Sequence, residues 1–258
     1  MAKKWAKFPH ADKAYVYDGA SLKQHWARLH RSDCEPFPKE PGAVEAWRLY
    51  HAGHFDSAVE AGTKAGGAAM NAAIKAQAIY ANYLEKTEKT KLALFEEAAR
   101  WASERRTAAP KDANAHYLYA YALGRYSQGI SVAKALAQGF GGKIKDALAA
   151  ALKLAPSHAD AHTAFGAYQA EVINKVGGLV AGMTYGAKKE AALEHYQKAL
   201  KLNPDSAIAR IEYANGLILL FGKERIDEAT EIYEQASKCK PADAMERLDV
   251  EMARSELE

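Results

Sequence analysis

The chain has 258 residues, of which 49% are apolar, and its 35 basic and 32 acidic residues leave a net charge of +3. This length corresponds to one large domain or two small ones and can bury a core without disulfides or metals. The apolar fraction excludes a wholly disordered chain, and the even charge balance does not by itself indicate a nucleic-acid or membrane partner. About a fifth of the residues are alanine, which favours helix.

The sequence contains no pattern that directs it to a membrane or an oxidising compartment. Charged residues interrupt the amino terminus before any apolar stretch, so we expect no secretory signal. The longest apolar run, around residues 217–221, is far shorter than a membrane-spanning helix. Cys34 and Cys239 are isolated and fit a reducing compartment. We therefore predict a cytoplasmic protein without membrane insertion.

The first 40 residues are predicted to form an N-terminal arm. Four of the eight prolines fall within the first 41 residues and break any long helix. Residues 14–19 read as a short extended piece, and Ser21 is expected to cap one helix over residues 22–31. The four tryptophans, which all precede residue 102, are expected to pack the arm against the first helix pair; the alternative is that Trp5 or Trp26 anchors a partner.

The later prolines mark an internal repeat. Pro110, Pro156 and Pro204 each begin the pattern Pro-x-x-Ala-x-Ala followed by His or Arg, and Pro241 starts a fourth copy. Ahead of the last two prolines, Ala-x-x-x-Tyr-x-x-Ala puts small and aromatic residues on one helical face. Such a unit cannot bury its apolar face alone, so it must stack on its neighbours.

These residues resemble the tetratricopeptide repeat (TPR) family. Its second-helix pattern stands at Ala192, Tyr196, Ala199 and Pro204, and the resemblance covers residues 41–258. It implies an all-α fold, a right-handed superhelical stack of antiparallel helix pairs. A first helix pair is expected around Trp47 and Tyr50, with a turn at Gly53 and a second helix starting near Phe55. Another pair is expected at 68–84 and 90–106, and the charged helix at about 242–258 is expected to be a polar outer cap that ends the stack.

Two repeats are longer than the 34 residues typical of the family. The prolines at 110, 156 and 204 are separated by 46 and 48 residues, and the extra residues fall in 124–142 and 170–187. Both segments are rich in glycine and apolar residues and are expected to be long loops between the first and second helix of a pair. In this they are similar to a subgroup that includes the TPR component of TRAP-type transporters and the regulators of microtubule dynamics.

No catalytic motif is present. The glycines at 139–142 depart from a phosphate-binding loop at two defined positions, and His51-x-x-His54 lacks a third metal ligand. We expect neither a cofactor, a metal nor an enzymatic activity.

The resemblance implies binding on the concave face lined by the first helix of each pair. The sequence therefore predicts a non-catalytic scaffold that binds a peptide or protein segment, without a role for nucleic acid and with homo-oligomerisation left open. The alternative is a small amphipathic ligand in an apolar pocket formed by the long insertions. A deep enclosed apolar cavity beside 124–142 and 170–187 would favour this ligand, whereas an open groove with those segments packed as ordinary core would favour the scaffold. A solvated face is an equal alternative for the polar stripe Asn71, Lys75 and Asn82. The candidate binding residues are Asn71, Lys75, Asn114, Tyr117, Tyr121, Arg125, Glu171 and Asn215.

Overall fold

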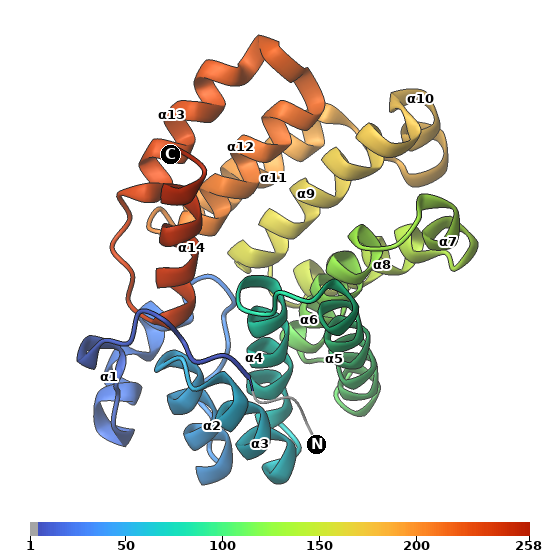
Figure 1. Cartoon of the computed structure of the whole chain (residues 1–258). Helices are drawn as coiled ribbons and strands as arrows, with labels where there is room; N and C mark the ends of the chain where they lie inside the picture. Colours follow the sequence, from blue (N-terminus) through green and yellow to red (C-terminus); the bar gives the residue numbers. More distant parts are fainter. Residues whose placement is uncertain (1–4) are drawn as a thin grey trace.

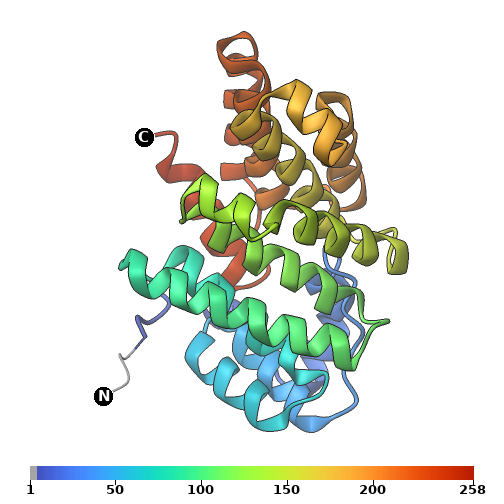
Figure 2. The ribbon, with the colours of Figure 1, turned by 90° about the vertical axis from the view of Figure 1, so that its right-hand side faces the viewer.

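The computed structural model describes residues 5–258, and this part of the chain contains helices and no strand (Figure 1). The predicted all-α stack of helix pairs is confirmed. Successive pairs lie one above another along the molecule (Figure 2). The pairs are α2 (Pro41–His51) with α3 (Phe55–Ala65), α4 (Ala69–Tyr83) with α5 (Glu88–Ala108), α6 (Ala113–Gln128) with α8 (Phe140–Leu154), α9 (Ala159–Val176) with α11 (Lys189–Leu202), and α12 (Ala207–Phe221) with α13 (Ile226–Ser237).

The repeated proline motif marks the start of a helix because it carries an N-cap. The residue two positions after each repeat proline is the N-cap, and its side chain accepts a hydrogen bond from a backbone N–H three residues later. This bond satisfies one of the N–H groups that a helix start leaves without a partner. The four caps are Asp112, His158, Ser206 and Asp243.

Tyr196 shows why the Ala-x-x-x-Tyr pattern specifies helix packing. Its buried ring lies against Gly166 of α9 and Gly216 of α12. A Cβ atom on these glycines would lie 2.9 Å and 2.6 Å from the ring, closer than van der Waals contact. The absence of side chains at both positions therefore lets three helices pack around one tyrosine.

The two insertions are more helical than expected. The segment 124–142 continues α6 and then forms a short helix, α7 (Val132–Ala137). The segment 170–187 continues α9 and then forms α10 (Gly178–Val180) and a single π-helical turn, η2 (Ala181–Tyr185). Gly177 ends α9 with a φ of +79°, a conformation that glycine adopts without strain. The expectation of long loops is therefore wrong for most of both segments.

The arm packs into the core of the first repeats. It contains η1 (Lys13–Tyr15) and α1 (Gly19–Leu29), whose N-cap is Asp18; Ser21, the expected cap, is the third helical residue and completes the capping box. The Trp5 ring stacks on Tyr80 at 3.9 Å, and Trp26 packs edge-on against Trp47 at 6.0 Å. The predicted packing of the arm against the first helix pair is thus confirmed for Trp26 and Trp47, whereas Trp5 packs on α4 of the second pair and Trp101 packs against a separate core cluster.

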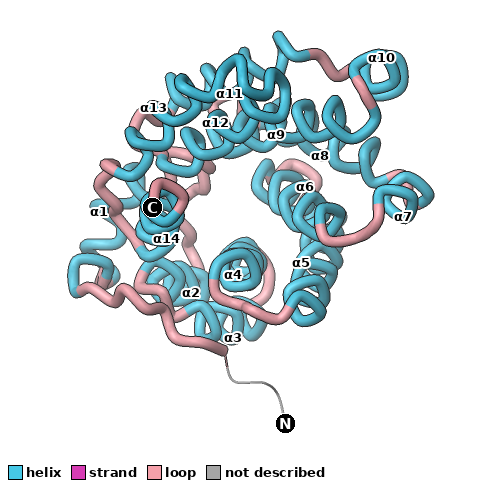
Figure 3. Tube along the Cα trace, turned by 45° about the horizontal axis from the view of Figure 1, so that its top comes forward, coloured by secondary structure: helices cyan, strands magenta, loops and turns pink. Residues whose placement is uncertain are grey.

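The last helix, α14 (Ala244–Ser255), joins the end of the stack to its beginning. It packs against α12 and α13 on one side and α2 on the other, so the helices follow a ring in projection (Figure 3). Ala244 and Leu248 belong to the same core cluster as Trp26 and Trp47. The expectation of a polar outer cap is wrong, because one face of this charged helix is buried between the two ends of the stack.

Candidate functional site

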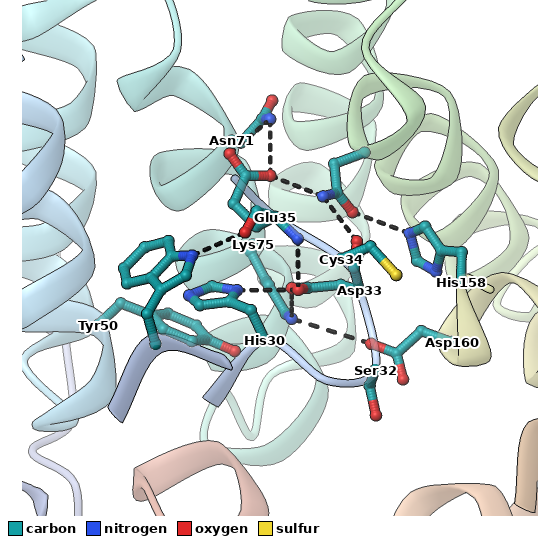
Figure 4. Close-up of polar contacts among 12 residues, drawn as sticks. His30, Ser32, Asp33, Cys34, Glu35, Tyr50, Asn71, Lys75, His158 and Asp160 are labelled. Carbon is teal, nitrogen blue, oxygen red and sulfur yellow. Dashed lines mark hydrogen bonds and ion pairs between the residues drawn. The ribbon is translucent and has the colours of Figure 1, made fainter. Parts of the chain in front are cut away.

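The segment that follows α1 passes the N-terminal ends of α4, α6 and α9 and contacts several repeats (Figure 4). The Ser32 carbonyl accepts a 3.0 Å hydrogen bond from the backbone N–H of Asp160, at the start of α9. The Ser32 hydroxyl accepts one of 2.7 Å from the Asn203 side chain, and Arg31 pairs with Asp205 at 2.9 Å. We call residues 30–35 the arm junction. It connects the arm to repeats that are far away in the sequence.

Asp33 is the charged centre of the arm junction. Its carboxylate accepts hydrogen bonds from the Lys75 ammonium at 2.6 Å and the His30 Nδ1 at 2.8 Å, and all three side chains are buried. Burial alone would raise the pKa of Asp33, but His30 and Lys75 hold it well below its ordinary value. Asp160 lies 3.9 Å from Lys75, and burial raises its pKa to about 6.

Glu35 is a buried carboxyl without a cationic partner. Its oxygens accept hydrogen bonds from the side-chain amides of Asn71 at 3.1 Å and Asn114 at 2.6 Å. Burial, together with the neighbouring carboxylates Asp33 and Asp112, raises the pKa of Glu35 to about 8. Glu35 is therefore mainly protonated at neutral pH, and it joins α4 and α6 to the arm as a neutral group.

A chain of buried side chains links the arm junction to α14. The Nε2 atoms of His30 and His51 lie 3.2 Å apart, and the Nδ1 of His51 lies 2.7 Å from the Asp243 carboxylate. The chain Asp33–His30–His51–Asp243 thus joins the arm, α2 and the start of α14. Both ring nitrogens of His51 have these protein partners, and the described residues contain no group of three or more side chains placed to hold a metal ion.

Three of the predicted binding residues contact the arm. Asn71, Lys75 and Asn114 are buried, and their polar groups bind Glu35 or Asp33. The alternative that 71 and 75 lie on a solvated face is therefore wrong. Their role toward an external partner stays a prediction, but the adjacent part of the concave face is occupied by the chain itself.

A cavity of about 190 Å³ lies beside the arm junction, between α6, α8, α9 and the two insertions. Its wall is mostly aliphatic and aromatic, and both insertions contribute to it, with Val132 and Leu136 from one and Val176 and Tyr185 from the other. The cavity has the position and the apolar wall expected for the small-ligand alternative, but it is partly open to solvent rather than enclosed. Further apolar wall residues are Leu118, Phe140, Ile144, Leu148, Tyr168 and Val172.

The end of the cavity nearest α14 is polar. Arg125 donates a 2.7 Å hydrogen bond to Glu212 of α12, and its guanidinium lies 5.4 Å from the centre of the Tyr121 ring. Tyr83 donates a hydrogen bond to Asp249 of α14, and burial raises the pKa of Asp249 well above its ordinary value. The polar end therefore holds the Arg125–Glu212 ion pair and a carboxyl whose pKa burial raises.

The structure gathers five of the eight predicted binding residues around this cavity. They are Lys75, Tyr117, Tyr121, Arg125 and Glu171. Asn71 and Asn114 lie at the arm junction, and Asn215 accepts a 2.6 Å hydrogen bond from Tyr233 between α12 and α13.

Tyr83, Glu212 and Asp249 were not predicted from the sequence. Glu212 lies on α12, and the sequence does not distinguish it from its neighbours, so only the structure shows that it lines the cavity. Asp249 belongs to the helix expected to be an outer cap, so no sequence signal places it here.

The chain belongs to the regulator of microtubule dynamics protein 1-3 family, whose model matches residues 68–257. A thermophilic TPR protein from Thermus thermophilus has a similar solved structure, with a TM-score of 0.57 and 17% identity over 83% of this chain and 97% of that chain. This likeness shows the fold, and both predicted resemblances, to TPR proteins and to the microtubule-regulator subgroup, are confirmed. No curated protein matches the sequence.

The fold is of the type that serves as an interaction scaffold and is typically non-catalytic. In the described part of the chain, none of the helices combines the length and apolarity needed to cross a bilayer.

Proposed function

We propose that this member of the regulator of microtubule dynamics family is a non-catalytic binding protein for a small amphipathic molecule. The apolar part of the ligand lies in the cavity between α6, α8 and α9, and its polar head lies near Arg125 and Asp249. The observation that carries the proposal is the cavity itself, because both insertions contribute apolar side chains to its wall. Apolar pockets with a few convergent polar groups are the usual binding sites for small molecules.

The size and charge of the cavity restrict the ligand. A dry apolar cavity of about 150 Å³ holds one benzene molecule, so a cavity of about 190 Å³ accommodates a somewhat larger ring system or the end of an alkyl chain. Arg125 is already paired with Glu212, Lys75 with Asp33 and Lys175 with Glu171, and burial raises the pKa of Asp249, which disfavours its carboxylate form. A head group that is uncharged and forms hydrogen bonds therefore fits better than a strong acid or base.

The sequence-based alternative is a peptide or protein segment on the concave face. A peptide groove needs a continuous open surface along the first helices of successive pairs. The arm junction covers Asn71, Lys75 and Asn114, and α14 covers the surface between α12 and α2. These contacts favour the small ligand over an extended peptide.

Calorimetric titration with 2-naphthol, an apolar bicyclic ring with one hydroxyl, tests the proposal. We expect saturable binding with one site per chain, abolished by Ala164→Phe, since Ala164 of α9 lines the cavity. Ala149→Phe is the matched control, because Ala149 is exposed on α8 and does not line the cavity. The absence of binding to the unmodified protein, or equal loss in both variants, would contradict the proposal.

A further inference from the structure

The C-terminal parts of the two insertions, together with the first residues of the helices that follow them, form a cationic surface, in contrast to the rest of the chain. Segments 131–145 and 174–189 contain six lysines and no aspartate or glutamate, although the whole chain has nearly equal numbers of basic and acidic residues. The lysines are Lys134, Lys143, Lys145, Lys175, Lys188 and Lys189. All except Lys145 are exposed, and Lys175 pairs at 3.2 Å with Glu171, which precedes the second segment. We call the surface of these two segments the insertion edge.

The insertion edge also exposes large apolar side chains. Leu179 and Met183 are 78% and 81% exposed, and Val132, Leu136 and Val180 are more than 40% exposed. These five are half of the ten large apolar residues with the greatest exposure in the described chain. Exposed apolar side chains at this density mark an interaction surface, because isolated ones are normal but clusters are rare.

Both segments lie at the same edge of the molecule, where α7 and α10 project outward (Figures 1 and 3). Lys145 of α8 donates a 2.7 Å hydrogen bond to the carbonyl of Tyr185, which ends η2. A Cβ atom on Gly141 would lie 2.8 Å from the Tyr185 ring, so the two segments are in direct contact. The two segments thus contact each other at one edge of the molecule, and both carry exposed apolar side chains and lysines.

We infer that the insertion edge docks on an anionic lipid surface, with Leu179 and Met183 entering the headgroup layer and the lysines contacting lipid phosphates and carboxylates. Aliphatic side chains flanked by lysines are the combination that binds proteins to the surface of anionic bilayers. This docking is peripheral, in agreement with the absence of a membrane-spanning helix among the described residues. It does not depend on the cavity being occupied.

A second copy of the chain is a poorer occupant of the same surface. A symmetric dimer through the insertion edge would place the same patch on both sides of the interface. The lysines of one copy would then face those of the other, without any acidic residue from either segment to compensate them. Charge complementarity therefore favours an anionic partner over self-association.

Vesicle co-sedimentation with the full chain tests the apolar contribution. We expect binding to vesicles of phosphatidylcholine with about one third phosphatidylserine, and little binding to phosphatidylcholine alone. The double variant Leu179→Ser, Met183→Ser should bind at least about tenfold more weakly. Val16→Ser, Leu154→Ser is the matched control, because both residues are exposed but lie outside the insertion edge.

The charge contribution has its own pair of variants. Lys143→Glu, Lys188→Glu should abolish the preference for phosphatidylserine, whereas Lys39→Glu, Lys64→Glu, at positions outside the insertion edge, should keep it. Helical circular dichroism of each variant verifies that it is folded. Equal binding to both vesicle types, or equal loss in the control variants, would overturn the inference. So would a dimer, seen by analytical ultracentrifugation, that only Leu179→Ser, Met183→Ser dissociates.

Discussion

Replacing Glu35 with glutamine tests the protonation state of the arm junction. The side chain is 6% exposed, and its oxygens accept hydrogen bonds from Asn71 and Asn114. Glutamine keeps the shape and the neutral state of the protonated carboxyl but cannot ionise. The substitution therefore removes the pH dependence that Glu35 contributes and leaves the packing of the arm nearly unchanged.

The magnitude follows from the pKa of Glu35, which burial raises from 4.5 to about 8. Between these values the unfolded chain releases the proton and the folded chain retains it, so the stabilising contribution is complete below pH 4.5 and is lost as the pH rises through 8. Each pKa unit corresponds to about 1.4 kcal/mol. The free energy of unfolding of the unmodified protein should therefore decrease by about 3–4 kcal/mol relative to Glu35→Gln between about pH 5 and pH 8.

Urea unfolding followed by tryptophan fluorescence at several pH values between about 5 and 8 measures this difference. The variant should become progressively more stable than the unmodified protein as the pH rises. Glu40→Gln is the control, because Glu40 belongs to the same arm and is exposed. The stability of this variant should change with pH in parallel with that of the unmodified protein. A constant difference between the Glu35→Gln and unmodified curves would refute the reasoning, since it would mean that Glu35 is ionised in the folded state throughout this range.

Two further substitutions test the packing on which the site depends. Lys75→Met leaves Asp33 buried without its ammonium partner, so the free energy of unfolding at neutral pH should fall by about 3–5 kcal/mol. A change within about 0.5 kcal/mol would show that the ion pair is not formed. Gly216→Ala places a Cβ atom 2.6 Å from the Tyr196 ring and should cost about 1–3 kcal/mol, whereas Gly142→Ala, with open space around the new methyl group, should stabilise by about 0.5–1 kcal/mol. Urea denaturation measures both glycine variants, and equal effects would contradict the packing argument.

The helix pairs could be predicted from the sequence because their signals are local. The interval between proline and N-cap, as at Pro110 and Asp112, repeats at fixed offsets. The small and aromatic residues around Tyr196 also recur at fixed offsets. Both depend on neighbours within one or two turns of helix, so the spacing alone indicates them.

The ring closure and the arm junction could not be predicted in this way. His51 meets Asp243 at a separation of 192 positions in the sequence, and nothing in the local pattern of α14 distinguishes an outer cap from a helix between the two ends of the stack. The candidate site also depends on contacts between residues that are far apart in the sequence. Tyr121 and Arg125 could be predicted from the repeat, whereas Asp249 reaches the cavity only through the closure.

Native mass spectrometry of the purified full chain tests the central claim, that the cavity binds a small molecule, most directly. We predict a bound molecule of low mass that copurifies with the unmodified protein and with Ala149→Phe, and that is missing from Ala164→Phe. A spectrum of unliganded protein, together with a protein partner captured reproducibly and equally by both variants, would contradict the account and favour the peptide-binding alternative.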